Sequence, residues 1–260
     1  MTRDRELFFI HSGHRDQIIE IHNFYVAQAK KRIMQPFTDA SISSDADQAE
    51  KDAVESKSEV FHPDIHDESD LFEDAFHEGV WRYQLLTNLR DDMRLNIVAG
   101  FFHQWEKTLR DWLVVNLRHW HRGSKVHSEL WKQNIGRIFD LLKSLGWDVR
   151  SEAYFHHLDA CRLVVNVHKH GDGPSLQELD KLYPRYLKHP LISLSGHVSA
   201  KWMKPTHEHL SVSDADLDQF SDAIRQFWTD LPDRLVQISS TKLPQWFEDA
   251  IKADRKAVSV

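Results

Sequence analysis

The sequence has a single cysteine, Cys161, among its 260 residues. No disulfide can form within the chain, which excludes the stapled scaffolds on which many small secreted proteins depend. The first residues contain no apolar run followed by a small-residue cleavage site, so they predict no signal peptide. No stretch reaches the ~18 consecutive apolar residues of a membrane-spanning helix. We therefore expect a cytoplasmic protein without a membrane partner.

Glycine and proline are also scarce, with nine and eight residues. Hydrophobic residues make up 41% and aromatic residues 11% of the chain, an ordinary globular balance that can build a large core. Because few turn-forming residues imply few, long elements, the composition favours helices over many short strands. We predict an all-α fold, a bundle of about five main helices.

The motifs of several enzyme classes are missing. The glycines at 171 and 173 follow a predicted helix instead of opening one, so they form no phosphate-binding loop or dinucleotide fingerprint. No nucleophile elbow is present. Among the eighteen histidines, His62 and His66 have a helical metal spacing, but Pro63 between them favours a solvated loop. We expect no metal site and no cofactor.

Negative charge is concentrated in one segment. From Thr38 to Glu78 there are fourteen Asp or Glu residues and two Lys residues, a net charge of −12. The whole chain carries −7, so the remainder carries +5. A mildly basic body with an acidic insertion does not exclude acidic partners such as nucleic acid.

Composition divides the chain into three parts. Residues 1–37 hold an N-terminal helix that Pro36 ends. Residues 38–70 are an acidic linker with sparse apolar residues, for which we expect a flexible loop. Residues 71–260 form the main helical domain. The linker is either a solvated tether or a strap that covers a basic surface.

The main domain contains several amphipathic patterns. A long helix is expected over about 93–120, because apolar residues recur there at steps of three and four. Ser128 can cap the next helix, and Gly146 can end it in a left-handed conformation. Ser213 is the N-cap of a later helix, which Pro232 ends. Short helices are expected over 175–187 and 244–253, and one or two short strands within 188–212.

The helix expected over 152–169 carries the most suggestive chemistry. On a helical wheel, Arg162, Asn166 and Lys169 share one face, and His170 borders it. The adjacent stripe of the helix is apolar up to His168, which ends it. This stripe includes Cys161, which we expect to be a buried, inert thiol. The cluster is either a set of polar and basic residues that cap the last turn, or a phosphate-handling site. In the second case, arginine holds a phosphodiester and histidine transfers a proton.

Arg162-x5-His168, at the end of a helix in an all-helical chain, resembles the Arg-x4–6-His motif of the HEPN superfamily. The surrounding segment is also similar to the R-x-x-x-N-x-x-KHG helix end of bacterial HEPN-like proteins; it reads ACRLVVNVHKHGDGPS. The earlier segment NIVAGFFHQWEKTLRDWL resembles their preceding long helix, and the segment Leu210–Leu231 resembles their final helix. The resemblance covers residues 80–232.

The resemblance implies a homodimer that cleaves RNA without a metal ion, often as a toxin with an antitoxin partner or in phage defence. Arg162 would hold the phosphate, and His168 would act as general acid or base while the 2′-hydroxyl attacks. Other members of the superfamily catalyse nothing and bind a nucleotide or a partner protein. Both readings, endoribonuclease and catalytically inactive binding module, stay open.

Two features of the sequence depart from the family pattern. Leu163 stands where a polar residue usually follows the motif arginine, and an alternative alignment pairs Asn166 with His170. In addition, Arg162 and His168 lie about 120° apart on a regular helix, so they converge only if the helix unwinds or a second subunit completes the site.

Glu106 and Arg110 lie one turn apart on the long helix, at i and i+4. This pair is either a surface ion pair that contributes a few tenths of a kcal/mol, or support for the arginine of the motif.

Overall fold

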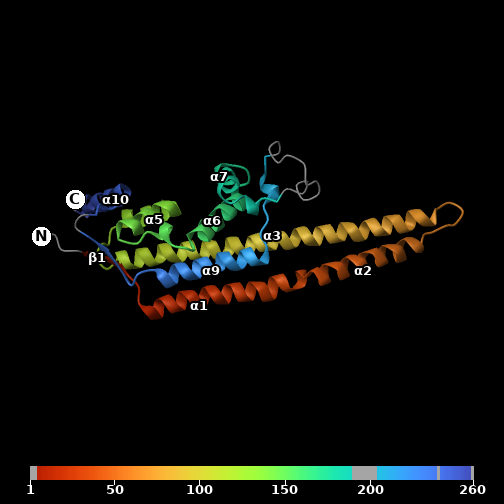
Figure 1. Cartoon of the computed structure of the whole chain (residues 1–260), viewed down its shortest axis with the longest axis horizontal. Coiled ribbons are helices and arrows are strands. Elements are labelled where there is room, and N and C mark those ends of the chain that lie inside the picture. Colours follow the sequence, from red (N-terminus) through yellow and green to blue (C-terminus); the bar gives the residue numbers. More distant parts are fainter. Residues whose placement is uncertain (1–4, 189–203, 239–240, 259–260) are drawn as a thin grey trace.

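The computed structural model describes residues 5–188, 204–238 and 241–258. Helices dominate these residues, which confirms the all-α class (Figure 1). Three long helices lie alongside one another in the body: α1 (Ser12–Ala29), the second half of α3 (Glu68–Leu117) and α9 (Asp214–Asp230). Apolar residues of α1, α3 and α9 belong to one continuous core, so the N-terminal helix is part of the body.

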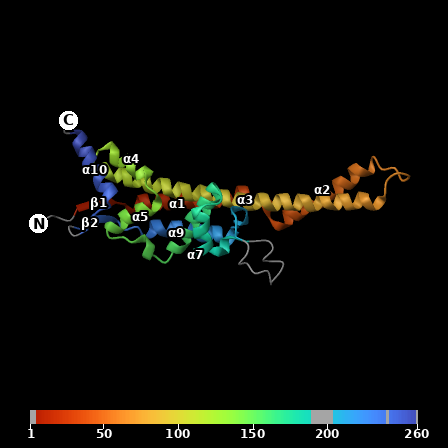
Figure 2. The ribbon, with the colours of Figure 1, turned by 90° about the horizontal axis from the view of Figure 1, so that it is seen from above.

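The acidic segment is where the structure departs most from the sequence prediction. The expected loop is wrong for the segment Asp39–Ser58, which forms helix α2, and α3 begins at Glu68, well before residue 93. Helix α1 leads into α2 through a π-helical turn at Lys30–Met34 and a 3-10 turn at Gln35–Phe37. Helix α2 then runs antiparallel to the first half of α3, and the two extend beyond the body as an arm (Figures 1 and 2).

The arm forms because small side chains let its two helices approach closely. Thr38 caps α2 by accepting a hydrogen bond from the backbone N–H of Ser41 at 3.2 Å. Ile42 and Ala46 are buried on α2, and Gly79 is buried on α3. A Cβ atom at Gly79 would lie 3.1 Å from the Cβ of Glu50 on α2, which is tighter than ordinary packing. Alanine and glycine give a weak hydrophobic pattern, so the sequence does not predict this helix pair.

The segment after α3 holds two helices where one was expected. Helix α4 (Ser124–Lys132) begins before Ser128, so this serine is not an N-cap. Helix α5 (Ile135–Ser144) begins after Asn134, whose side chain accepts the backbone N–H of Arg137 at 3.0 Å. Gly146 follows α5 with φ of 97°, as the sequence predicted for a left-handed terminus.

The later helices follow their sequence signals more closely. Helix α6 (Phe155–His170) ends at Gly171, which has φ of 68°. Helix α7 (Pro174–Leu182) follows directly. Ser213 caps α9 in a reciprocal capping box with Asp216, as its position predicts.

A two-stranded sheet closes the end of the body opposite the arm (Figure 1). The strands β1 (Arg5–Phe9) and β2 (Arg234–Gln237) pair in antiparallel fashion, and α10 (Gln245–Val258) packs beside them against α4. Neither strand was predicted from the sequence. Short strands were expected within 188–212, of which residues 189–203 lie outside the described residues. In the described part, Leu210 pairs with Leu187, just before that segment, as an isolated bridge.

None of the helices in the described part of the chain combines the length and the apolar character that crossing a membrane requires.

Candidate functional site

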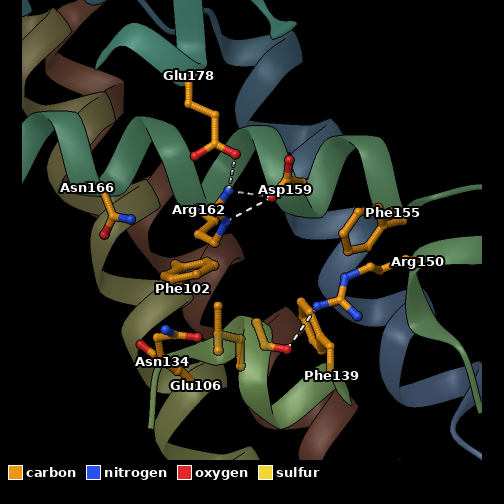
Figure 3. Close-up of a pocket in the computed structure, with 12 residues that line it drawn as sticks. Phe102, Glu106, Asn134, Phe139, Arg150, Phe155, Asp159, Arg162, Asn166 and Glu178 are labelled. Atoms are coloured by element: carbon orange, nitrogen blue, oxygen red, sulfur yellow. Dashed lines mark hydrogen bonds and ion pairs between the residues drawn. The ribbon is translucent and has the colours of Figure 1, made fainter. Parts of the chain in front are cut away.

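A cavity of about 530 Å³ lies between α3, α5, α6 and α7 (Figure 3). This volume falls in the range of small-molecule sites. Its walls combine apolar and charged side chains, and they include three residues that the sequence had singled out: Glu106, Arg162 and Asn166. The other lining residues are Phe102, Asn134, Ile135, Gly136, Phe139, Arg150, Phe155, Asp159 and Glu178.

Arg162 stands at the centre of the α6 wall. Its guanidinium pairs with the carboxylate of Asp159 one turn earlier at 2.8 Å, and with Glu178 of α7 at 3.3 Å (Figure 3). The hydroxyl of Tyr183 donates a second hydrogen bond to Asp159, at 3.1 Å. About a quarter of the Arg162 side chain is exposed, 23%. The arginine is therefore held in place, and one side of it remains open to the cavity.

The helical wheel correctly placed Arg162 and Asn166 on one face, because α6 is regular throughout. His168 lies on a different face and is not among the lining residues; its Nε2 is 3.4 Å from the side-chain oxygen of Asn96 on α3. Helix α6 does not unwind near Asn166, so one chain does not bring Arg162 and His168 together by that route. Lys169 and His170 are exposed at the end of the helix.

Glu106 and Arg110 do not form a surface ion pair. Arg110 is buried, with 7% of its side chain exposed, and it donates to the carboxylate of Glu106 at 2.5 Å. It also donates to the backbone oxygen of Gln133 at 2.9 Å and approaches that of Leu130 at 3.5 Å. Arg110 therefore ties α3 to the turn between α4 and α5, and Glu106 reaches the cavity from beside it.

The opposite end of the cavity is aromatic and basic. Phe139 of α5 and Phe155 of α6 lie with ring centroids 5.9 Å apart in an edge-to-face arrangement. The guanidinium of Arg150 lies 5.8 Å from the Phe139 ring centroid and is fixed by Asp140 at 2.8 Å and the Gly136 carbonyl at 2.9 Å. Figure 3 shows this group facing Arg162 across the cavity. Such a wall suits a flat, polar ring.

His103 lies one turn before Glu106 on α3 and was not singled out from the sequence. Burial lowers its pKa, Glu106 opposes that shift, and Lys169 lowers the pKa further. A neutral imidazole is therefore favoured near the open end of α6.

Metal binding and cysteine chemistry can be compared with the described part of the chain. The described residues contain no cluster of three or more His, Cys, Asp or Glu side chains placed to hold a metal ion. Cys161 is fully buried on the apolar side of α6, and burial raises the pKa of its thiol well above the ordinary value. The thiolate is the nucleophilic form, so this cysteine is suited to packing rather than catalysis.

Four lining residues were not predicted from the sequence, although two of them have local signals. Asp159 has a signal, since it precedes Arg162 by three positions on the same helix. Asn134 has the signal of an N-cap, which was missed because one continuous helix was expected there. Glu178 and Arg150 reach the cavity only through the packing of α7 and of the turn before α6, and nothing local predicts it.

No family model matches the chain, and neither a curated protein nor a solved structure shows significant similarity to it.

Proposed function

We propose that this protein binds a nucleotide, free or within single-stranded RNA, in the cavity lined by Arg162. The observation that carries the proposal is the presence of a fixed, partly open arginine in a cavity that also has a phenylalanine wall. This proposal corresponds to those HEPN-like proteins that bind a nucleotide and catalyse nothing. It does not require His168 to reach the cavity.

The chemistry of the walls matches the parts of a nucleotide. A base can stack on the wall formed by Phe139 and Phe155, since every base has an aromatic face. The side-chain amides of Asn134 and Asn166 offer both donors and acceptors for base edges. The carboxylate of Glu178 can accept hydrogen bonds from ribose hydroxyls or exocyclic amines.

Arg162 is the group suited to phosphate. A guanidinium presents a planar fork of donors that matches phosphate oxygens. In the free protein, Asp159 and Glu178 occupy that fork. The ion pair with Glu178 is the longer one, and Glu178 is 46% exposed, so a phosphate can replace this partner at the lower cost. The remaining pair with Asp159 keeps the arginine oriented.

Beyond the cavity, the same helix continues to Lys169 and His170, which are exposed and follow Asn166 within one turn. A strand of RNA with one base in the cavity can place its next phosphates along these cations, where they also meet the negative end of the helix dipole. The mildly basic body and the separate acidic arm are compatible with this path.

Replacing Arg162 by alanine is expected to raise the Kd for a short fluorescein-labelled single-stranded RNA at least about tenfold, since a hydrogen bond to a charged group contributes about 1.5–3 kcal/mol. Fluorescence anisotropy measures the Kd, and AMP, GMP, CMP and UMP serve as competitors. Arg225→Ala is a matched control, because Arg225 forms the same i,i+3 ion pair, with Asp222 at 2.8 Å, on α9 away from the cavity.

Equal losses in the two variants would mean that binding depends on net charge alone and would contradict the proposal. Wild-type protein that is folded yet binds neither RNA nor any of the four nucleotides would also contradict it. Competition by one nucleotide only would identify the preferred base.

The second candidate is metal-independent RNA cleavage of the HEPN type, as in a toxin or a phage-defence protein. The observation that favours it is that Arg162, Asn166 and Lys169 lie along one helix face, bordered by His170, and that this face ends in solvent. His168 can join Arg162 only across a dimer interface, because α6 is unbroken. The composite site therefore requires two copies whose α6 ends approach each other.

If the site is catalytic, purified protein cleaves mixed cellular RNA in EDTA, and Arg162→Ala and His168→Ala each lower the rate at least about 100-fold. A loss of this size is usual for an acid–base group such as His168 and for a group that stabilises transition-state charge, as Arg162 would. Loss of cleavage in His170→Ala alone would favour the alternative alignment. Light scattering reports the oligomeric state, and a monomer that still cleaves RNA would rule out the composite site.

A further inference from the structure

The arm, defined as residues 39–92, has an unusually apolar surface for an exposed structure. On its α3 side, Trp81 is 56% exposed and Phe76 is 55% exposed. Large apolar side chains that lie together in solvent mark interaction sites more often than chance. The exposed apolar residues of this part of α3 are Phe72, Phe76, Val80, Trp81, Tyr83, Leu85 and Leu89.

These residues are exposed because α2 covers only one side of α3. The packed side contains Ala75 and Gly79, both buried. Trp81, Leu85 and Leu89 recur every four positions and therefore share another side of the helix. Figure 2 shows that the arm extends beyond the body, so no described element of the body covers this side.

A groove runs along the same flank of the arm. It has a volume of about 450 Å³ and is lined on α3 by Glu78, Arg82 and Leu86. Each of these lies within one turn of Trp81 or Leu85. On α2 the lining is acidic, with Asp45 and Asp52. The flank is thus an acidic groove bordered by a row of exposed apolar side chains.

The charge of the arm decides which partner fits. Residues 39–92 hold sixteen Asp or Glu and four Lys or Arg, a net charge of −12. A second copy docked arm to arm would place −12 against −12, which disfavours association. A partner with positive charge gains from the same field.

We propose that this flank of the arm binds a basic amphipathic helix of a partner protein. Apolar side chains of the partner, spaced one turn apart, would pack on Trp81, Leu85 and Leu89. Lysines or arginines on the side of the partner helix that faces the groove would meet Asp45, Asp52 and Glu78. This is the helix-in-groove mode of recognition, with electrostatic complementarity to select the partner. The inference does not rest on the nucleotide site, which lies in the body.

The probe is a synthetic helical peptide in which leucines repeat every three or four positions and lysines fill the remaining positions, labelled with a photocrosslinker. Two peptides of equal length serve as controls: one with glutamate in place of lysine, and one with the leucine and lysine order scrambled. The double variant Trp81→Ser, Leu85→Ser of the full chain removes the apolar row. Leu182→Ser is the matched control, because Leu182 is a similarly exposed leucine on α7, at 48%.

We expect the leucine–lysine peptide to bind wild type and Leu182→Ser equally, and the double variant at least about tenfold more weakly, with crosslinks within residues 45–89. Both control peptides should also bind at least about tenfold more weakly than the probe. Circular dichroism confirms that the helices of the double variant persist.

Three results would overturn the proposal: unchanged affinity in the double variant, crosslinks confined to the body, or equal binding of the scrambled peptide. A wild-type dimer that the double variant converts to monomer would do the same, since the arm's occupant would then be a second copy.

Discussion

Replacing Arg110 by methionine is expected to lower the free energy of unfolding by about 3 kcal/mol, because the change removes one partner of a buried ion pair. Arg110 is almost fully buried between α3 and the α4–α5 turn. Methionine keeps most of its volume but leaves the Glu106 carboxylate and the Gln133 carbonyl without their donor. Urea denaturation followed by circular dichroism measures the loss.

Arg137→Met is the control for this prediction. Arg137 contacts the same turn, with a hydrogen bond to the side chain of Gln133 at 2.9 Å, but it is exposed. Its replacement should change the stability by no more than about 0.5 kcal/mol. If Arg110→Met were equally mild, the buried pair of Glu106 and Arg110 would contribute no more to stability than a surface ion pair.

The Arg110 variants also connect stability to the site. The turn that Arg110 holds contributes Asn134 to the cavity. Replacing both members of the pair, by Glu106→Leu with Arg110→Met, should restore part of the stability, since no buried charge remains unpaired. Nucleotide affinity should not recover with it, because Glu106 lines the cavity. If both the stability and the nucleotide affinity recovered, Glu106 would not contribute to ligand binding.

The elements that the sequence predicted well are those whose signals are local. Helix α9 has its N-cap at Ser213 and its apolar stripe within the helix itself, and both are as expected. Helix α2 lacked such a signal, because its sequence is mostly polar and acidic and it buries only Ile42 and Ala46. Strands β1 and β2 pair across more than two hundred residues of sequence, as between Arg5 and Gln237, and no local pattern reveals a partner that distant.

In the candidate site, too, the sequence predicted the local features and not those that depend on tertiary packing. A regular helix fixes which residues share a face, so the sequence could place Arg162 and Asn166 together. The same regularity keeps His168 away from Arg162 within one chain. What the sequence could not supply was the opposite wall, since Phe139 and Glu178 arrive from other elements through tertiary packing. The burial of Arg110 could not be predicted from the sequence either, because it depends on the packing of α4 and α5 against α3.

Replacing Asp254 by alanine is expected to lower the free energy of unfolding by about 3 kcal/mol, because one buried and one partly buried backbone donor lose their acceptor. Helix α4 begins after Gly123, which has no side chain to cap it. Asp254 of α10 takes that role and accepts the backbone N–H groups of Lys125 at 2.9 Å and Val126 at 3.0 Å. Chemical denaturation at neutral pH measures the loss, and Asp249→Ala, an exposed site on the same helix, is the control.

The same carboxylate sets a pH dependence. Burial alone would raise the pKa of Asp254, but hydrogen bonds from His121 and from the two backbone N–H groups lower it below its ordinary value. A carboxylate with a lowered pKa in the folded state stabilises the protein above its unfolded pKa, near 3.8, and that contribution is lost as the pH falls through the folded pKa. The stability difference between wild type and Asp254→Asn should therefore shrink on acidification below about pH 4. A difference that stays constant down to that range and beyond would mean that the charge of Asp254 contributes nothing.

Gly123→Ala should resemble Asp254→Ala, because a Cβ atom at that position would overlap the carboxyl group and push α10 away from α4.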